Sequence, residues 1–140
     1  MYRKYILGGL ALLAAFGAGV ALSPKFVAAQ ANLFVPKEVV REDMVGMPGQ
    51  EVLVQYIEYK PGAAVPWHLH PDAHEMTVVV EGTTWLEVEG QGKRQLNVGD
   101  GFHMQPNVVH RGGNESNASA KVVTVRIKPK DKPILVPVQR

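Results

Sequence analysis

The sequence predicts an all-β sandwich or barrel. Short runs of β-branched and aromatic residues are separated by turn residues about every 8–12 positions, as in such folds. The 140 residues include 14 Gly and 10 Pro, a composition that suits many turns. No segment sustains helical periodicity, and no internal repeat of about 20–50 residues is visible.

The expected strands follow one another along most of the chain. Residues 32–50 are expected to be mostly irregular, with one short strand near residues 38–41. The tail, residues 129–140, is expected to be extended, with its Ile-Leu-Val-Pro-Val segment along a sheet edge. Between them, the expected strands are residues 51–59, 65–70, 75–80, 84–88, 94–98, 102–104, 108–111 and 120–128.

The first 31 residues have the layout of a secretory signal peptide. Arg3 and Lys4 precede an uncharged, mostly apolar run of 17 residues, and a small-x-small cleavage pattern ends at Ala31. The alternative is an uncleaved N-terminal anchor, because this run has the minimum length of a membrane span. We therefore expect a domain over residues 32–140, with its core in residues 51–128. It would be periplasmic or secreted, or else held at the membrane by the N-terminal segment.

Composition excludes several classes of function. The chain has no Cys, which rules out a disulfide scaffold, a thiolate metal site and a cysteine nucleophile. Without the first 31 residues it has 12 basic and 13 acidic residues, a net charge of −1, which does not favour binding to nucleic acid or to an anionic membrane. It also lacks a phosphate-binding loop and a Gly-x-Ser-x-Gly elbow. The expected partner is a small molecule.

Two of the five histidines have the spacing of metal ligands. His68 and His70 lie two apart on an expected strand, so both rings share one face and can reach one ion at about 2.1 Å. A Pro-Asp turn follows, and either His74 or Glu75 can then supply the third ligand. Both cannot, because adjacent strand residues face opposite ways. No spacing argument involves His103, which is expected to be an ordinary polar residue.

This segment resembles the first motif of the cupin family. The motif's fixed positions hold Gly62, His68, His70, Glu75 and Gly82, separated by five, one, four and six residues. Five fixed residues at fixed offsets are a specific signal.

A second segment resembles the second cupin motif at its ends. Gly99 and His110 are separated by ten residues, and Asn114 follows after three more. The interior departs from the motif, because Gln105 holds the proline position and the proline comes one place later. Asn107 stands at the second glycine position, and Asn is the residue after Gly that best tolerates a left-handed backbone.

The resemblance implies a jelly-roll β-barrel over about residues 51–128. It implies that His68, His70, Glu75 and His110 bind one divalent transition metal (Mn, Fe, Ni, Cu or Zn), which resolves the third ligand in favour of Glu75. Three imidazoles and one carboxylate leave two positions open on a six-coordinate ion. The turn glycines of both motifs and Asn114 would serve structure.

The resemblance also implies a function. The chain is similar to quercetin-dioxygenase-like cupins, which suggests a periplasmic metal-dependent oxygenase acting on a small oxygen-rich or aromatic compound, with Glu75 as a catalytic base. A cupin isomerase or lyase, or a non-catalytic metal- or ligand-binding module, fits the same ligands. A homodimer through residues 33–40 or 134–138 is also compatible. Strand position suggests these side chains at the mouth of the site: Gln55, Tyr56, Trp67, Met76, Met104 and Gln105.

Overall fold

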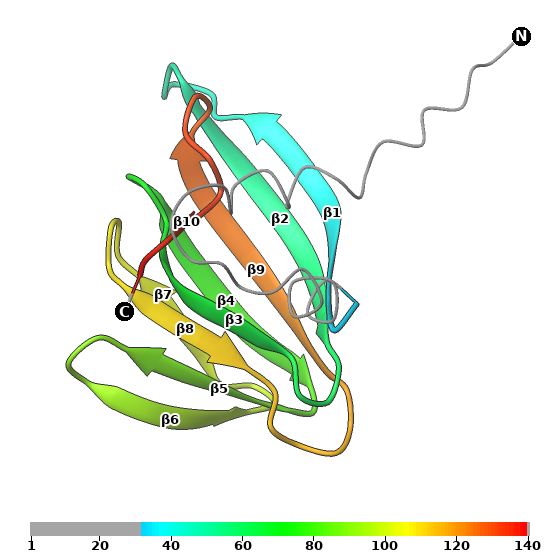
Figure 1. Ribbon diagram of the computed structural model, residues 1–140. Helices are drawn as coiled ribbons and strands as arrows, with labels where there is room; N and C mark the ends of the chain where they lie inside the picture. The colour runs from blue at the N-terminus through cyan, green and yellow to red at the C-terminus, as the bar shows by residue number, and fades with distance from the viewer. Residues whose placement is uncertain (1–31, 140) are drawn as a thin grey trace, which may run out of the picture.

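The computed structural model describes residues 32–139 of the chain, and the leader expected over residues 1–31 lies outside the described residues. The described chain forms ten strands in two five-stranded sheets (Figure 1). Within these same residues no helix is long and apolar enough to cross a membrane. The predicted all-β class is confirmed.

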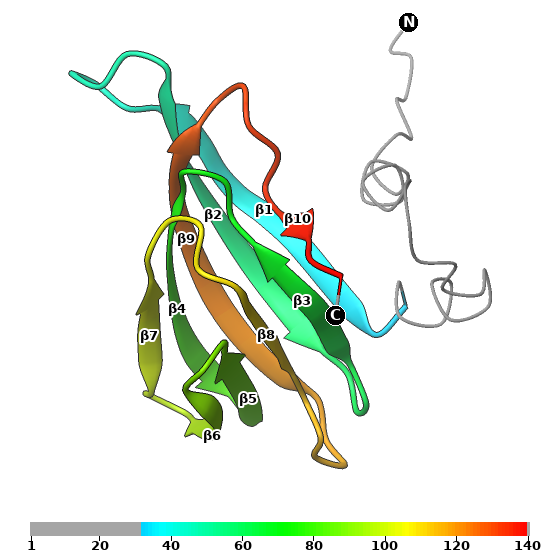
Figure 2. The same cartoon turned by 60° about the vertical axis from the view of Figure 1, so that its left-hand side comes forward.

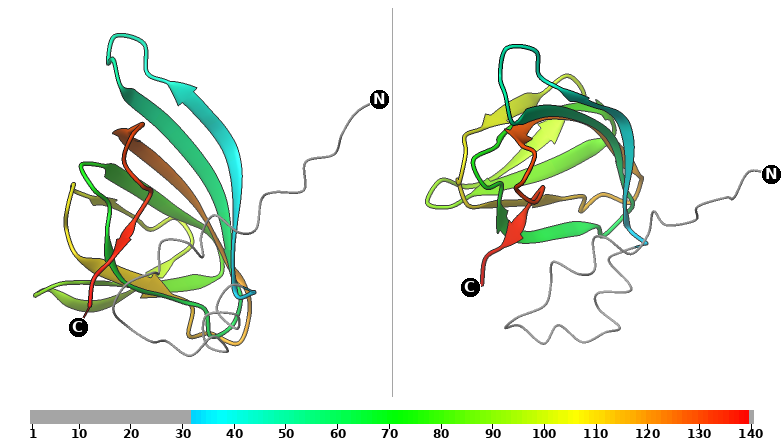
Figure 3. Two further views of the ribbon diagram at one scale, coloured as in Figure 1. Left: turned by 45° about the horizontal axis from the view of Figure 1, so that its top comes forward. Right: turned by 90° about the horizontal axis from the view of Figure 1, so that it is seen from above.

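The two sheets face each other around one interior (Figures 2 and 3). The first has the order β1 (Phe34–Asp43), β2 (Gln50–Tyr59), β9 (Ala120–Pro129), β4 (His74–Glu81) and β7 (Gly101–Met104). The second has the order β10 (Val136–Pro137), β3 (Ala64–Leu69), β8 (His110–Gly113), β5 (Thr83–Val88) and β6 (Gly92–Asn97). All pairings among them are antiparallel, and consecutive strands such as β3 and β4 lie in different sheets.

The interior is apolar along one part of the strands and polar along the next. On β9, buried and half-buried residues alternate over the whole strand, so every second side chain points inward. The apolar part is a cluster of Ile57, Val79, Leu86, Leu96, Met104 and Val122. Further along β2, β4 and β9, most inward positions hold buried polar residues, with Leu53 as an apolar exception: Glu51, Gln55, Glu75, Thr77, Thr124, Arg126 and Lys128. The sheet thus presents a polar surface to the interior above an apolar core.

Two sequence expectations about strands were wrong. Residues 32–50 are not mostly irregular, because β1 pairs with β2 along its whole length, with a bulge between Glu38 and Val40. This strand is an exposed sheet edge and lacks the alternation that marks a half-buried strand. β8 begins at His110 and not at residue 108, since a turn with Asn107 at φ 64° precedes it. The edge position of the tail is confirmed, because β10 pairs with β3 at the margin of the second sheet.

The motif glycines occupy turns, as expected. Gly62, Gly82 and Gly99 have φ values of 79°, 71° and 90°. Gly82 is also sterically required, because a Cβ there would lie 2.8 Å from the carbonyl oxygen of Ser119. Any other residue at this position would meet both backbone strain and a clash.

Asn114 is a buried structural residue that joins two loops. Its Nδ2 donates to the carbonyl oxygens of Tyr59 (2.9 Å) and Ala118 (2.7 Å). Its Oδ1 accepts hydrogen bonds from the backbone N–H (2.9 Å) and the hydroxyl (2.7 Å) of Ser116. One side chain therefore makes four hydrogen bonds that join the end of β2 to the loop before β9.

Replacing Asn114 should be costly for stability. We expect Asn114→Ala to lower the free energy of unfolding by about 3 kcal/mol, because it removes four hydrogen bonds of a fully buried side chain, among them the one to the carbonyl oxygen of Tyr59. Asn117→Ala changes an exposed residue of the same loop and should stay within about 0.5 kcal/mol of the wild type. Urea unfolding of both variants measures the difference, and equal effects would contradict the structural role.

Candidate metal centre

Three histidines lie close together on the inner face of the second sheet. His68 on β3 and His110 on β8 are direct cross-strand partners, and His70 follows the last residue of β3. Their ring centroids are 4.3–5.1 Å apart. All three side chains are buried, and one candidate ligand nitrogen from each lies within 4.8 Å of the others. The structure thus brings together the three histidines that the sequence singled out.

The backbone fixes the protonation of each ring. Every Nδ1 lies against a carbonyl oxygen: His68 against Pro66 (2.7 Å), His70 against Ile134 (2.5 Å) and His110 against Val108 (2.9 Å). A carbonyl oxygen can only accept, so Nδ1 carries the proton and Nε2 of the neutral ring keeps a lone pair. Among the described residues, Nε2 of His110 is buried with no hydrogen-bond partner, and Nε2 of His70 faces a carboxylate oxygen of Glu75. This is the form in which a histidine ligates a metal.

Two tied turns hold the histidines in place. Asp72 (φ 52°) follows β3, and Asn107 (φ 64°) precedes β8. The backbone N–H of Asp72 donates to Oδ1 of Asn107 (3.1 Å), and Nδ2 of Asn107 donates to Oδ1 of Asp72 (2.9 Å). The backbone N–H of Asn107 also donates to the carbonyl oxygen of His70 (3.1 Å). The departure from the second motif at Asn107 therefore strengthens the link between the two turns.

The C-terminal tail is part of the site. After β9 it crosses to the free edge of β3 (Figure 1), where Val136 pairs with Leu69 and the N–H of Val138 donates to the carbonyl oxygen of Trp67 (2.8 Å). On the way it supplies the carbonyl of Ile134 to His70. The sequence predicted the edge position of this tail but not its contact with a candidate ligand.

Glu75 completes the cluster from the opposite sheet. It lies on β4, and its Oε2 is 2.7 Å from Nε2 of His70. Arg126, its cross-strand partner on β9, places Nη2 2.6 Å from the same oxygen. Nη1 of Arg126 donates to Oε1 of Gln55 (2.6 Å), and the hydroxyl of Thr77 donates to Oε1 of Glu75 (3.3 Å). The structure places Glu75, and not His74, beside the three histidines.

These four side chains fit a divalent metal. A contact of 2.7 Å between Nε2 of His70 and Oε2 of Glu75 joins two lone-pair atoms, which repel unless a positive charge is shared between them. Neighbouring ligands on one octahedral ion are about 3 Å apart when the bonds are about 2.1 Å. Three nitrogens and one carboxylate oxygen are a donor set for first-row transition metals.

Burial and charge set the protonation of the cluster. Burial, together with the neighbouring His110 and His70, lowers the pKa of His68 to about 3. Burial likewise lowers the pKa of His110. Burial alone would raise the pKa of Glu75, but the charge of Arg126 holds it well below its usual value. Near neutral pH, His68 and His110 are therefore neutral and Glu75 is ionised.

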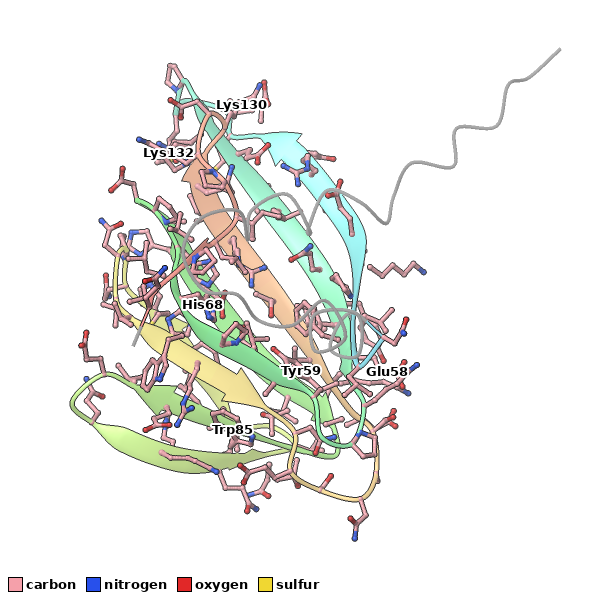
Figure 4. All side chains as sticks on the ribbon, viewed as in Figure 1. Glu58, Tyr59, His68, Trp85, Lys130 and Lys132 are labelled. Atoms are coloured by element: carbon pink, nitrogen blue, oxygen red, sulfur yellow. The ribbon has the colours of Figure 1, made fainter. Side chains whose placement is uncertain are left out.

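A cavity of about 50 Å³ lies against this cluster. His68, Glu75, His110 and Arg126 line it together with apolar residues, and Leu135 of the tail contributes to its wall. Tyr59 and Trp85, labelled with His68 in Figure 4, also line it. Burial, with the charge of Glu75, raises the pKa of Tyr59, so its hydroxyl keeps its proton.

Most of the side chains expected at the mouth lie elsewhere. Gln55 does point inward and contacts Arg126. Tyr56 and Met76 point outward from the first sheet, where strand alternation places them opposite Gln55 and Glu75. The ring of Trp67 packs under Arg111. Met104 belongs to the apolar core, and Gln105 is exposed. These positions were inferred from the alternation of side chains along each strand, and the turns between strands change which face a given position occupies.

The two remaining histidines form a separate pair. Nδ1 of His74 is 2.9 Å from Nε2 of His103, on the outer face of the first sheet. Neither belongs to the group of three buried histidines.

Arg126 is the site residue that sequence reasoning missed. The sequence did indicate its direction. On the expected strand over residues 120–128, Arg126 lies two and four positions from Thr124 and Val122, so the three side chains share one face. A cation on the inward face of a strand needs a buried partner, and here that partner is Glu75.

Comparison with known proteins identifies the family. A sequence profile of the cupin domain matches residues 55–126, just over half of the chain. The chain belongs to the cupin family. The germin-like protein subfamily 2 member 3 of Arabidopsis thaliana is 32% identical to this cupin over 103 residues, which are 69% of this chain and 47% of that protein. The chain thus spans about half the length of this curated relative.

Solved structures show the cupin jelly roll. Oxalate oxidase in complex with glycolate matches with a TM-score of 0.59 and 22% identity, over 86% of this cupin and 59% of that chain. The DMSP lyase DddQ from Ruegeria pomeroyi matches with a TM-score of 0.64 and 18% identity, over 86% and 57%. The cupin domain of an XRE family transcriptional regulator from Enterobacter cloacae matches with 0.58 and 20%, over 70% and 99%. At these identities the likeness shows the fold alone.

The lowered histidine pKa values predict a pH dependence of stability. Below a pH of about 6.5 the unfolded chain protonates histidines that stay neutral in the fold, so the metal-free cupin should lose stability as the pH falls. Glu75 stabilises the fold until the pH falls below its unfolded value of about 4.5, so the interval above that pH reports the histidines. Thermal unfolding with a chelator present at several pH values between about 7.5 and 4.5 measures this slope.

A matched pair of variants assigns the slope. His68→Gln should flatten it, because the buried ring is removed, while His103→Gln changes an exposed ring and should leave it unchanged. A melting temperature that does not fall between these pH values would contradict the burial of neutral histidines.

Proposed function

We propose that this cupin binds one divalent transition metal through His68, His70, His110 and Glu75, and that it is a metal-dependent, oxygenase-like enzyme for a small oxygen-rich compound. The observation that supports this best is the set of buried imidazoles whose Nδ1 atoms are anchored, so that the Nε2 lone pairs face a common space. Buried lone pairs without partners are costly unless something binds them.

The metal would supply Lewis-acid chemistry and positions open to oxygen ligands. The chain's own residues would do the rest. Arg126 holds Glu75 ionised, so its carboxylate can ligate the metal, while the lowered pKa of Glu75 makes it a weak base. Thr77 and Arg126 contact different oxygens of this carboxylate and fix its plane. The protonated Tyr59 hydroxyl is a further hydrogen-bond donor in the cavity wall.

The cavity favours the smaller of the expected substrate classes. A volume of about 50 Å³ corresponds to roughly four water molecules, at about 10–15 Å³ each. A compound of a few heavy atoms fits this space. The likeness to oxalate oxidase, solved with glycolate, and to a germin-like protein adds weight to a small oxygen-rich substrate.

Export from the cytoplasm is part of the proposal. It is supported by the leader-like layout of residues 1–31 in the sequence. An exported cupin would take its metal outside the cytoplasm.

The first test is metal content. We expect about one equivalent of Mn, Fe, Ni, Cu or Zn, and we expect His68→Ala or His110→Ala to abolish stoichiometric binding because each removes a ligand. His74→Ala and His103→Ala are matched controls and should retain the metal. Elemental analysis of the purified proteins measures the metal content of the wild type and of each variant. Loss of the metal in the controls but not in the first pair would contradict the ligand set.

The tail supplies a second test. Deleting residues 134–140 removes the carbonyl that orients His70, and should weaken metal affinity by about 10–100-fold, as is usual when the partner of a ligand is lost. Deleting only residues 139–140 keeps β10 and should leave affinity unchanged. Competition with a metal-sensitive dye measures both, and circular dichroism checks the fold. Equal affinities would show that the tail does not orient His70.

Oxygen consumption tests the reaction class. We expect the metal-loaded protein to consume O₂ with a small hydroxy- or dicarboxylic acid such as glycolate or oxalate, and not with a bulky phenol. Conversion of the compound without O₂ uptake would instead indicate an isomerase or lyase. Metal binding with no conversion of any such acid would indicate a binding module.

A further inference from the structure

His74 and His103 place two nitrogen donors together on the outer face of the first sheet, away from the buried histidines. His74 is the first residue of β4, and His103 lies on β7, the edge strand beside it. Nδ1 of His74 is 2.9 Å from Nε2 of His103. His103 is exposed and His74 is half-buried, so the pair can be reached from solvent. The function proposed above makes no use of this pair.

The spacing of these two nitrogens suits one shared metal ion. Ligands on one transition-metal ion are about 3–3.5 Å apart when the bonds are about 2.0–2.1 Å long. Without an ion the two nitrogens share one proton, and an ion that replaces this proton requires only a slight movement of two solvent-accessible side chains.

Gln105 is placed to orient one of the rings. Its side-chain amide nitrogen is 3.4 Å from Nδ1 of His103. Turning the amide over would present its oxygen instead, which can accept a hydrogen bond from the Nδ1–H group. His103 would then keep the lone pair of Nε2 for an ion, and a partner of this kind is usual for a histidine ligand.

Met76 brings a third donor to the same face. His74 and Met76 are two residues apart on β4 and both point outward, and Met76 is the direct cross-strand partner of His103. Side chains related in this way on one sheet face lie within reach of each other. The methionine side chain is unbranched and adaptable, so its sulfur can turn toward the two rings. The donor set is therefore two imidazole nitrogens and one thioether sulfur.

The surroundings favour a soft ion over a hard one. On β9, the cross-strand partners of His74 and Met76 are Ile127 and Val125, and the next outward residue of β4 is Val78. These neighbours are all apolar, so they offer none of the carboxylate oxygens that Ca²⁺ and Mg²⁺ prefer. A thioether combined with imidazoles is instead a donor set for copper, above all for Cu(I).

We propose that His74, Met76 and His103 form a surface site for Cu(I) that is independent of the buried metal centre. The site has three donors and one side open to solvent. The ion in it therefore exchanges readily, whereas an ion at the buried centre is enclosed by the two sheets.

Counting bound Cu(I) tests the site. The purified protein is titrated with Cu(I) without oxygen, with ascorbate as the reductant and a chromophoric Cu(I) chelator as the competitor. We expect the wild type to bind one equivalent more than His103→Gln, whatever the buried centre binds, because this variant removes one of the two nitrogen donors. Equal numbers of equivalents in the two proteins would overturn the proposal.

A methionine variant assigns the sulfur. Met76→Leu should weaken Cu(I) binding at this site about tenfold or more, because it removes the soft donor. Met47→Leu is the matched control, since Met47 is an exposed methionine in the loop between β1 and β2, and it should bind Cu(I) as the wild type does. Unchanged Cu(I) affinity in Met76→Leu would overturn the proposal.

X-ray absorption at the copper edge gives a second readout of the same donor. The ligands proposed for the buried centre are nitrogen and oxygen atoms, so a sulfur neighbour of copper comes from the surface site. We expect this sulfur signal in the wild type and in Met47→Leu, and its loss in Met76→Leu. Copper without any sulfur neighbour in the wild type would overturn the proposal.

The buried centre checks that the two sites are independent. His103→Gln and Met76→Leu change outward side chains, so circular dichroism should show the wild-type fold. After dialysis, elemental analysis should find the same metal content at the buried centre in these variants as in the wild type. Loss of that metal in a folded variant would show that the sites are coupled and would overturn the proposal.

Discussion

Three imidazoles can be buried together only if each places its single N–H on an acceptor, and this constraint shapes the candidate site. The backbone provides the acceptors from the strand residue Pro66, from Val108 in the turn before β8, and from Ile134 in the tail. Because those carbonyls lie on separate parts of the chain, the β3–β8 register, the tied turns and the path of the tail are all needed. The consequence is that the Nε2 lone pairs converge.

The opposing sheet adds the charges. Glu75 and Arg126 face each other across β4 and β9, and a buried pair of this kind gains little stability in itself, because removing both charges from water is costly. The pair instead sets the charge state of the site. Arg126 keeps Glu75 ionised next to His70, and Gln55 keeps Arg126 in plane. A site of neutral nitrogens and one carboxylate can thus bind a cation, and the guanidinium of Arg126 lies beside it in a fixed orientation.

Local patterns predicted the fold well and the site in part. Strands 51–59, 75–80 and 120–128 were readable from β-branched residues and turns, and the turn glycines from their spacing. β1 was missed because an exposed edge strand has no buried face to impose alternation. Arg126, the tail carbonyl and the cavity wall depend on pairing between distant strands. No local pattern shows which inward residue of β9 meets which residue of β4, and the register that decides this is a property of the whole sheet.

The most direct test of the account is anomalous diffraction at the metal absorption edge from crystals of the metal-loaded protein. The account predicts one strong peak within about 2.1–2.2 Å of Nε2 of His68, His70 and His110 and of an oxygen of Glu75. A peak only at the His74–His103 pair on the outer face would contradict it. So would the absence of any peak at the buried histidines after soaking with each of the five metals.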